Sequence, residues 1–268
     1  MKKLTFLMAT TLVLAGMSQS VHAANLASDN AADAVYSGGG NYNGLNGGTG
    51  FGAWINTPSA NSSVAGSFVF TSTANASGSL GIDSSGEAWG LYANSSNVSD
   101  AVRPFTGGAL SVGQTVKIDL DQGYEDTGAT VGIGLQNSSF DNLMQVYYIG
   151  GDSVNSWKKN DAANQSDLSP NVPFSGDGFH LEITLATATT YTGVLTSNDG
   201  GSAAFSGTLI SPLGGQDITQ VRLFNFNSGM GDNANFYGNS LAIVPEPSTV
   251  ALVGLGMLGA LVIRRRKD

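Results

Sequence analysis

The side chains that could do chemistry include one acidic cluster. Asp119 and Asp121 alternate with apolar residues, so on a β-strand both carboxylates lie on one face, and Glu125 and Asp126 follow shortly after. Two carboxylates about 5–10 Å apart are what glycoside hydrolysis needs, and oxygens gathered in an irregular loop suit Ca²⁺. The cluster lacks the ligand spacing of a helix-loop-helix calcium site. We therefore name no metal ligands; structural calcium stays open, and no other cofactor is expected.

Histidine chemistry would depend on His180, because the only other histidine, His22, lies in an N-terminal segment that we expect to be removed. On a strand His180 and Glu182 point the same way, so a hydrogen-bonded pair is geometrically possible. A Ser-His-Asp site would also need a serine on a turn such as Gly-x-Ser-x-Gly, which the sequence lacks. There is no cysteine, which excludes thiol catalysis. A solvated polar sheet face is the favoured interpretation, and we predict no catalytic residue and no enzyme.

Aromatic residues indicate a second kind of chemistry, the binding of carbohydrate by ring stacking and hydrogen bonds. Trp157 lies in a polar stretch, Ser156 to Asn160, that reads as a loop, so we expect it to be exposed and to contact sugar. Tyr147 and Tyr148 must face opposite ways on a strand, and Tyr148 is the second candidate contact. Trp54, Trp89 and Tyr92 lie on strand-like runs and are expected in the core.

The charge balance narrows the range of partners. Residues 24–245 hold five Lys and Arg against eighteen Asp and Glu, a formal net charge of −13. Binding to nucleic acid needs clustered cations that neutralise phosphates, so nucleic acid is excluded as a partner. An acidic surface of this kind suits a soluble protein outside the cell.

The elements that must position these residues are short strands. Thr115 to Asp121 and Phe179 to Leu185 alternate apolar and polar residues with period two, and clusters of Gly, Asn, Ser and Asp separate the runs. Similar runs are Ser67–Thr71, Glu87–Ala93, Thr130–Gln136, Leu143–Ile149, Thr190–Thr196, Ala204–Ile210, Val221–Asn227 and Asn235–Val244. No sustained 3.6-residue period occurs between them. The pattern predicts an all-β, antiparallel two-sheet sandwich, with a jelly roll as the favoured topology.

The stretch from Glu87 to Val244 resembles the concanavalin A-like jelly-roll domains of secreted bacterial proteins. The resemblance is carried by Trp89-Gly90-Leu91-Tyr92-Ala93, Gly113-Gln114-Thr115 and Val221-Arg222-Leu223-Phe224-Asn225. Such domains include glycosidases, and in the laminarinase-type enzymes the carboxylates come from a Glu-x-Asp-x-x-Glu strand. This chain lacks that pattern, so a secreted glycan-active enzyme is the disfavoured alternative.

Both ends of the chain read as sorting segments. Residues 1–23 have a Lys2-Lys3 start, an apolar stretch and a Val21-His22-Ala23 cleavage pattern, which predict a signal peptide and its helix. At the other end, sixteen uncharged residues from Ser248 to Ile263 are followed by the basic residues Arg264, Arg265, Arg266 and Lys267. A helix of this length spans about 24 Å, enough for a thin transmembrane helix whose cations stay in the cytoplasm.

The tail, residues 245–268, resembles the PEP-CTERM sorting signal of Gram-negative bacteria, with Pro245, Glu246 and Pro247 ahead of the apolar helix and the basic end. The resemblance implies export by the secretion machinery, transient anchoring in the inner membrane, and cleavage by an exosortase. We expect a Gly- and Asn-rich segment over residues 24–50 and the sandwich over 51–244. The expected function is a non-catalytic cell-surface or extracellular-matrix protein associated with exopolysaccharide; the alternative is a carbohydrate-binding module that contacts polysaccharide.

Overall fold

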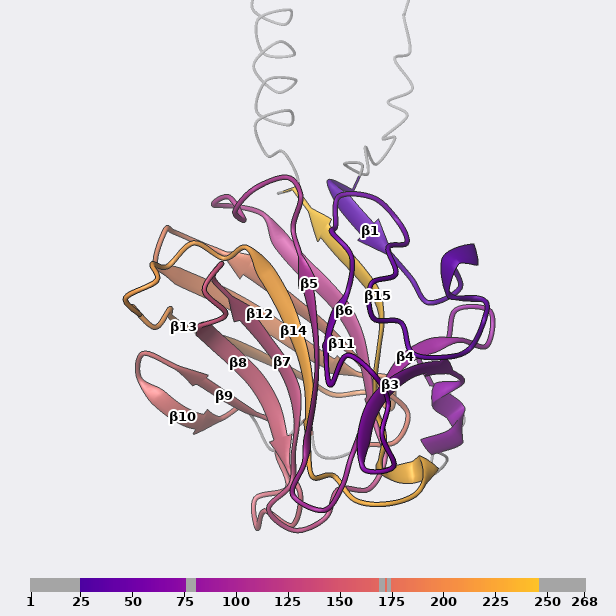
Figure 1. The fold of residues 1–268 in the computed structure, drawn as a ribbon. Coiled ribbons are helices and arrows are strands. Elements are labelled where there is room, and N and C mark those ends of the chain that lie inside the picture. The colour runs from indigo at the N-terminus through magenta and orange to yellow at the C-terminus, as the bar shows by residue number, and fades with distance from the viewer. Residues whose placement is uncertain (1–24, 76–80, 169–171, 173–174, 246–268) are drawn as a thin grey trace, which may run out of the picture.

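The computed structural model describes residues 25–75, 81–168, 172 and 175–245. These residues form two antiparallel sheets packed face to face (Figure 1), so the predicted two-sheet sandwich is confirmed. The helical elements among them are three short 3₁₀ turns, η1 (Ala34–Tyr36), η2 (Ser72–Asn75) and η3 (Asp232–Ala234). No helix in this part of the chain is long and apolar enough to cross a membrane. The expected signal helix and transmembrane helix lie outside the described residues.

The first sheet, sheet I, carries the C-terminal strand at its centre. Its order is β13 (Ser202–Thr208), β12 (Thr190–Ser197), β11 (Phe179–Leu185), β6 (Thr115–Gln122), β15 (Phe236–Val244), β4 (Ala88–Ala93) and β3 (Ala65–Phe70), and β1 (Ala27–Asp29) pairs with β15. Sheet II has the order β10 (Asn164–Asp167), β9 (Lys158–Asp161), β8 (Asn142–Ile149), β7 (Thr130–Gln136), β14 (Gln220–Phe226), β5 (Val98–Pro104) and β2 (Ile55–Thr57).

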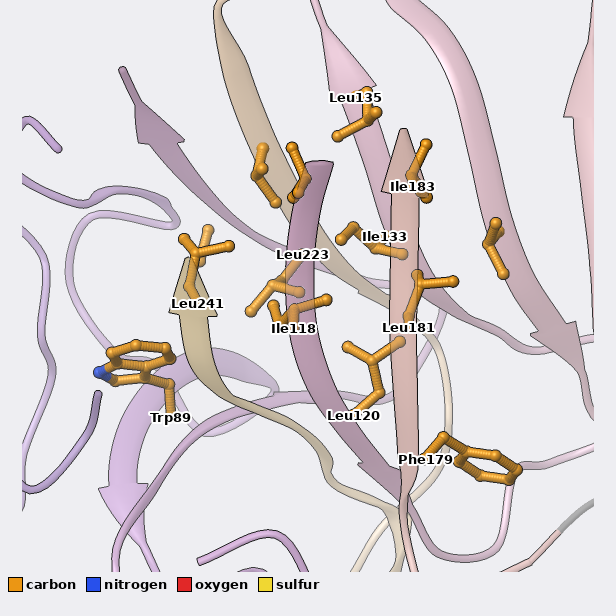
Figure 2. Close-up of a cluster of buried hydrophobic side chains, with 14 of the residues drawn as sticks. Trp89, Ile118, Leu120, Ile133, Leu135, Phe179, Leu181, Ile183, Leu223 and Leu241 are labelled. Atoms are coloured by element: carbon orange, nitrogen blue, oxygen red, sulfur yellow. The ribbon is translucent and has the colours of Figure 1, made fainter. Parts of the chain in front are cut away.

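The core lies between the sheets and follows the predicted alternation. On β11, Phe179, Leu181 and Ile183 are buried, whereas His180 and Glu182 on the opposite face are exposed. Figure 2 shows these side chains meeting apolar residues from strands β4, β6, β7, β14 and β15. Burial of this apolar surface, at about 25 cal/mol per Å², is the main source of stability in a domain of this size.

The segment expected to precede the sandwich is part of it. Residues 25–50 contribute β1 to sheet I, and the side chains of Tyr36 and Tyr42 are fully buried. Asp29 accepts hydrogen bonds from the Tyr36 hydroxyl (2.7 Å) and from the Arg103 guanidinium (2.6 Å). Arg103 also donates to the carbonyl oxygen of Gly47 (2.8 Å). Gly47, Gly48 and Gly50 pack so closely that a Cβ would come within 2.7 Å of a neighbouring atom, whereas Gly38, Gly40 and Gly44 have open space beside them. Because residues 25–50 pair and pack with the sheets, the boundary expected at residue 50 is not a domain boundary.

Both sheets and the core are complete by Val244, the last residue of β15. The described residues beyond it make no contribution to either sheet. The sandwich therefore needs no residue of the tail to build its core.

Candidate functional site

Trp157 is not a surface contact, and the expectation that it is exposed is wrong. The stretch read as a loop contains β9, which pairs with β8, and this pairing turns Trp157 into the core. Its indole packs edge-on against Phe179, with the ring centroids 5.1 Å apart. The two lysines that make the stretch look exposed are neutralised locally: Lys158 pairs with Asp152 (2.8 Å) and Asp167, and Lys159 pairs with Asp161 (2.5 Å).

Tyr148, the second predicted contact, is also buried. Its ring packs against Trp157 at 6.3 Å between centroids, and its hydroxyl is hydrogen-bonded to the side chain of Asn155. The neighbouring Tyr147 faces the other way and is half-buried, as alternation on a strand requires. Neither Trp157 nor Tyr148 offers a ring face to a sugar in this structure.

The acidic cluster divides into separate environments. Asp119 lies on the outer face of sheet I and pairs with His180, whereas Glu182 pairs with Lys117 (2.6 Å) rather than with His180. Asp121 is fully buried, and burial raises its pKa to about 7. Glu125 is likewise buried, with a pKa raised by burial to about 8. Within the described ranges, no three His, Cys, Asp or Glu side chains are grouped as metal ligands.

A polar groove of about 660 Å³ lies over β6, β11 and the end of β15. Its side chains are already engaged with one another, since cross-strand pairs join His180 to Asp119, Lys117 to Glu182 and the hydroxyls of Thr115 and Thr184. No Phe, Tyr or Trp side chain lines it among the described residues. The groove can offer hydrogen bonds and charge, and its aromatic ring is the imidazole of His180.

A second groove, about 600 Å³ in volume, does contain aromatic side chains; we call it the aromatic groove. It lies on the outer face of β3 and β4 and beside the loop before β15. Its aromatic lining is Phe68, Phe70, Tyr92 and Tyr237, and Met230 and Val69 also line it. Phe70 is 57% exposed and Met230 is 80% exposed, an unusual degree of exposure for apolar side chains that line one groove.

Glycines determine how the rings lie in the aromatic groove. Phe68 is opposite Gly90 in the register of β3 and β4. A Cβ at position 90 would lie 2.4, 2.7 and 2.8 Å from Cζ, Cε2 and Cε1 of Phe68. Three such similar distances place Gly90 beneath the face of the ring rather than at its edge. The ring therefore lies flat on the sheet and turns its other face toward the groove.

Tyr92 lies beside Phe68. It is opposite Gly66, where a Cβ would come within 2.6 Å of the Tyr92 hydroxyl oxygen. That hydroxyl donates to the carbonyl oxygen of Ser62 (2.6 Å), and the rings of Phe68 and Tyr92 are 6.1 Å apart. Partial burial raises the pKa of Tyr92, so the hydroxyl stays protonated and remains a donor. Tyr237, which is opposite Gly90 on β15, packs against Phe68 with the two rings nearly perpendicular and their centroids 5.6 Å apart.

Polar groups border these rings. Ser63 and Asp232 line the groove at exposed positions, and Asn94 and Asn235 lie at buried positions within it. Flat aromatic faces beside hydroxyl, amide and carboxylate groups can bind the apolar C–H face of a sugar ring while bonding its hydroxyls. Sequence reasoning missed Phe68, Phe70 and Met230, because Phe68, Val69 and Phe70 form an uninterrupted apolar run whose outward side the sequence does not show.

Residues 244–267 match the family described as the PEP-CTERM protein-sorting motif. The chain carries a PEP-CTERM motif. The match begins at Val244, so the motif follows directly on the central strand of sheet I. A PEP-CTERM motif implies an exported, surface-sorted protein of a Gram-negative bacterium that is processed by an exosortase. Of the matched residues, only Val244 and Pro245 are described in the structure.

Comparison with curated proteins finds no match to this PEP-CTERM chain. Among solved structures, it is similar to the conserved carbohydrate esterase vb_24B_21 from the Shiga toxin-encoding bacteriophage phi24B, with 13% identity and a TM-score of 0.51 over 84% of this chain and 99% of that one. Domain 4 of AbnA, an extracellular arabinanase from Geobacillus stearothermophilus, matches with 15% identity and a TM-score of 0.45 over 85% of this chain and 97% of that one. A lectin from Bauhinia forficata matches with 13% identity and a TM-score of 0.37 over 67% and 97%. At 13% identity the similarity to the esterase shows a shared fold alone.

Proposed function

We propose that this protein is an exported, non-catalytic component of the cell surface or extracellular matrix that binds polysaccharide through the aromatic groove. The observation that supports this most directly is the flat, outward-facing ring of Phe68 beside the exposed Phe70. Exposing such rings to water costs free energy unless a ligand or partner covers them, and a sugar ring matches their size and their neighbouring polar groups. The exosortase-sorting motif supports export of the protein to the cell surface, where it would contact exopolysaccharide.

The acidic surface is consistent with this role. All five Lys and Arg of residues 25–245 form ion pairs, four with Asp and one with Glu, so the excess acidic side chains dominate the exposed charge. Neutral or weakly charged polysaccharides approach such a surface without repulsion, whereas densely anionic ones are disfavoured. We therefore expect a neutral glycan as the ligand.

Affinity electrophoresis in gels that contain neutral polysaccharides tests the proposal with purified residues 24–245. We expect retardation of the wild-type sandwich and loss of most of it in Phe70→Ala, because stacking on an aromatic ring contributes on the order of 1 kcal/mol per ring. Phe226→Ala is the matched control, since Phe226 is 40% exposed but lies on sheet II. Equal retardation of Phe70→Ala and wild type would refute the aromatic groove as the binding site. If no polysaccharide retards the wild-type protein, polysaccharide binding is refuted and the protein is a matrix component that does not bind glycan.

A glycan-active enzyme is the second candidate, and the pair of His180 with Asp119 in the polar groove is the observation that favours it. A hydrolase there would release reducing ends or acyl groups from polysaccharide, and Asp119→Asn would abolish the release. We expect neither release from the wild-type protein nor any effect of that substitution on polysaccharide binding. Catalysis that disappears in Asp119→Asn would replace the non-catalytic proposal.

A further inference from the structure

Strand β13 is the outer edge of sheet I, at the opposite end from β3 (Figure 1). It pairs only with β12 among the described strands. Ser197 N donates to Gly201 O (3.1 Å) and Leu209 N donates to Thr189 O (2.8 Å), so Gly201 and Leu209, which flank β13, are hydrogen-bonded to the β12 side. In an antiparallel pair every second residue is bonded in this way, and the residues between them direct their N–H and C=O groups to the other side. The backbone groups of Ser202, Ala204 and Ser206 therefore point away from β12.

These outward backbone groups have no protein partner within the part of the chain that the structure describes. The side chains of Ser202, Ala204 and Ser206 are all exposed. At the end of the strand, only the carbonyl oxygen of Thr208 is used, by the amide of Ala162 (3.0 Å). The edge is therefore open from Ser202 to Ser206.

The other long edge of the sheet is blocked. On β3, the side chain of Asn61 accepts a hydrogen bond from Ser67 N (2.9 Å) and donates one to Ser67 O (2.8 Å), which occupies the middle of that edge. Of the two edges of sheet II, β2 is three residues long, and β10 is four residues long and ends in Asp167, which pairs with Lys158. Soluble proteins protect edges with charge, proline, bulges or covering side chains. Strand β13, with the sequence Ser-Ala-Ala-Phe-Ser-Gly-Thr, has neither charge nor proline.

We propose that β13 pairs antiparallel with β13 of a second copy of this chain, so that sheet I of one copy and sheet I of the other form one continuous sheet. The strand is self-complementary when Ala204 lies opposite Ala204 of the partner subunit. Ser202 then lies opposite Ser206 of the partner subunit, and every outward N–H meets an outward C=O. The side chains at all three positions are small, so they present little bulk to the approaching strand.

The charge distribution favours a second copy at this edge over other surfaces of the molecule. Two bodies with a formal charge of −13 repel each other, and the repulsion is least where the contact itself carries no acidic residue. Residues 202–208 contain none. Association should therefore strengthen with added salt, which screens the long-range repulsion and leaves the backbone hydrogen bonds intact.

Sedimentation velocity of residues 24–245 tests the pairing over a range of protein and NaCl concentrations. We expect a reversible dimer whose apparent Kd falls as NaCl rises from 20 to 300 mM. Ala204→Pro removes an outward N–H from each copy without breaking a hydrogen bond to β12, because proline is tolerated where the amide faces solvent. With two hydrogen bonds lost, the apparent Kd should rise about 10- to 100-fold.

Gln165→Pro is the matched control, since Gln165 occupies the corresponding outward position on the free edge of β10. It should leave the dimer unchanged. Should Ala204→Pro fail to fold by far-UV circular dichroism, Ala204→Lys serves instead, because the two-fold pairing sets two like charges opposite each other. A monomeric wild-type protein at 100 µM overturns the proposal. So does a dimer that both Ala204 variants leave intact or that Gln165→Pro disrupts equally.

Discussion

The buried carboxyl of Asp121 predicts an unusual dependence of stability on pH. Asp121 is fully buried on the outer face of sheet I, and neither of its oxygens has a hydrogen-bond partner among the described residues. Burial raises its pKa to about 7 from an ordinary value of 3.8, and the charges of Asp83 and Asp177 add to the shift. The Ser72 hydroxyl lies close enough to oppose it in part, although it is not in hydrogen-bond geometry.

The sign of the effect follows from the protons bound. Between pH 4 and pH 7 the folded protein keeps a proton on Asp121 that the unfolded chain has released, so the free energy of unfolding falls as pH rises. Since one pH unit corresponds to about 1.4 kcal/mol, ionised Asp121 costs on the order of 4 kcal/mol above pH 7. Glu125, with a pKa raised by burial to about 8, extends the same trend to higher pH.

Urea unfolding of residues 24–245 at pH 5 and at pH 8, followed by tryptophan fluorescence, measures this cost. We expect the wild-type sandwich to be more stable at pH 5. Asp121→Asn should raise stability at pH 8 by a few kcal/mol and change it little at pH 5, because Asn resembles the protonated acid. Asp217→Asn, at an exposed position, is the control and should change neither value.

Loss of stability in Asp121→Asn at pH 8 would refute this reasoning, since it would mean that the ionised carboxylate is favourably bound. A divalent cation is the obvious binder, and it can be tested separately. If EDTA lowers the Tm of the wild-type protein and Ca²⁺ restores it, while Asp121→Asn responds to neither, the carboxylate holds a metal rather than a proton.

Three further outcomes are expected. Asp29→Ala leaves Arg103 buried without its partner, and should lower the free energy of unfolding by about 3–5 kcal/mol in urea titrations, whereas replacing both residues with apolar ones should recover most of the loss. Gly90→Ala displaces the ring of Phe68, so it should cost about 1–3 kcal/mol and also weaken retardation in polysaccharide gels; unchanged retardation would count against the flat ring as the contact. Glu246→Ala should leave the full-length chain uncut and in the membrane fraction on immunoblots of an exosortase-bearing host, and normal processing would contradict the assigned role of the motif.

The sequence was sufficient to predict the strands whose two faces differ. β6 and β11 alternate apolar and polar residues because one face packs in the core and the other meets solvent, and the structure has both strands close to the predicted bounds. β7 and β14 lie centrally in sheet II and are richer in buried residues, and their apolar runs between turn residues were equally readable.

Strands that carry buried charges were not predictable. β5 contains Arg103, a residue that reads as exposed, yet its charge is satisfied by Asp29, 74 positions earlier in the chain. β9 begins with two lysines whose acidic partners, Asp152, Asp161 and Asp167, are near in the sequence. The sequence shows these charges but not that they pair with one another, and this is why Trp157 beside β9 was expected to be exposed.

The aromatic groove lay beyond sequence reasoning for a related reason. Phe68, Val69 and Phe70 are all apolar, so alternation cannot tell which of them faces the core. The structure turns Val69 inward and leaves Phe70 largely exposed. Only the register with β4, which sets Gly90 beneath Phe68, shows that the Phe68 ring lies flat on the outer face of the sheet and is not part of the core between the sheets.

The central place of β15 has a consequence for the order of events during export. A chain that crosses the membrane from its N-terminus delivers β15 last, yet this strand joins β6 to β4 and also pairs with β1. Sheet I therefore stays split in two until the final strand has emerged, by which point the sorting motif beginning at Val244 has reached the membrane. Closure of the sandwich and presentation of the cleavage motif are thus tied to the same moment of translocation.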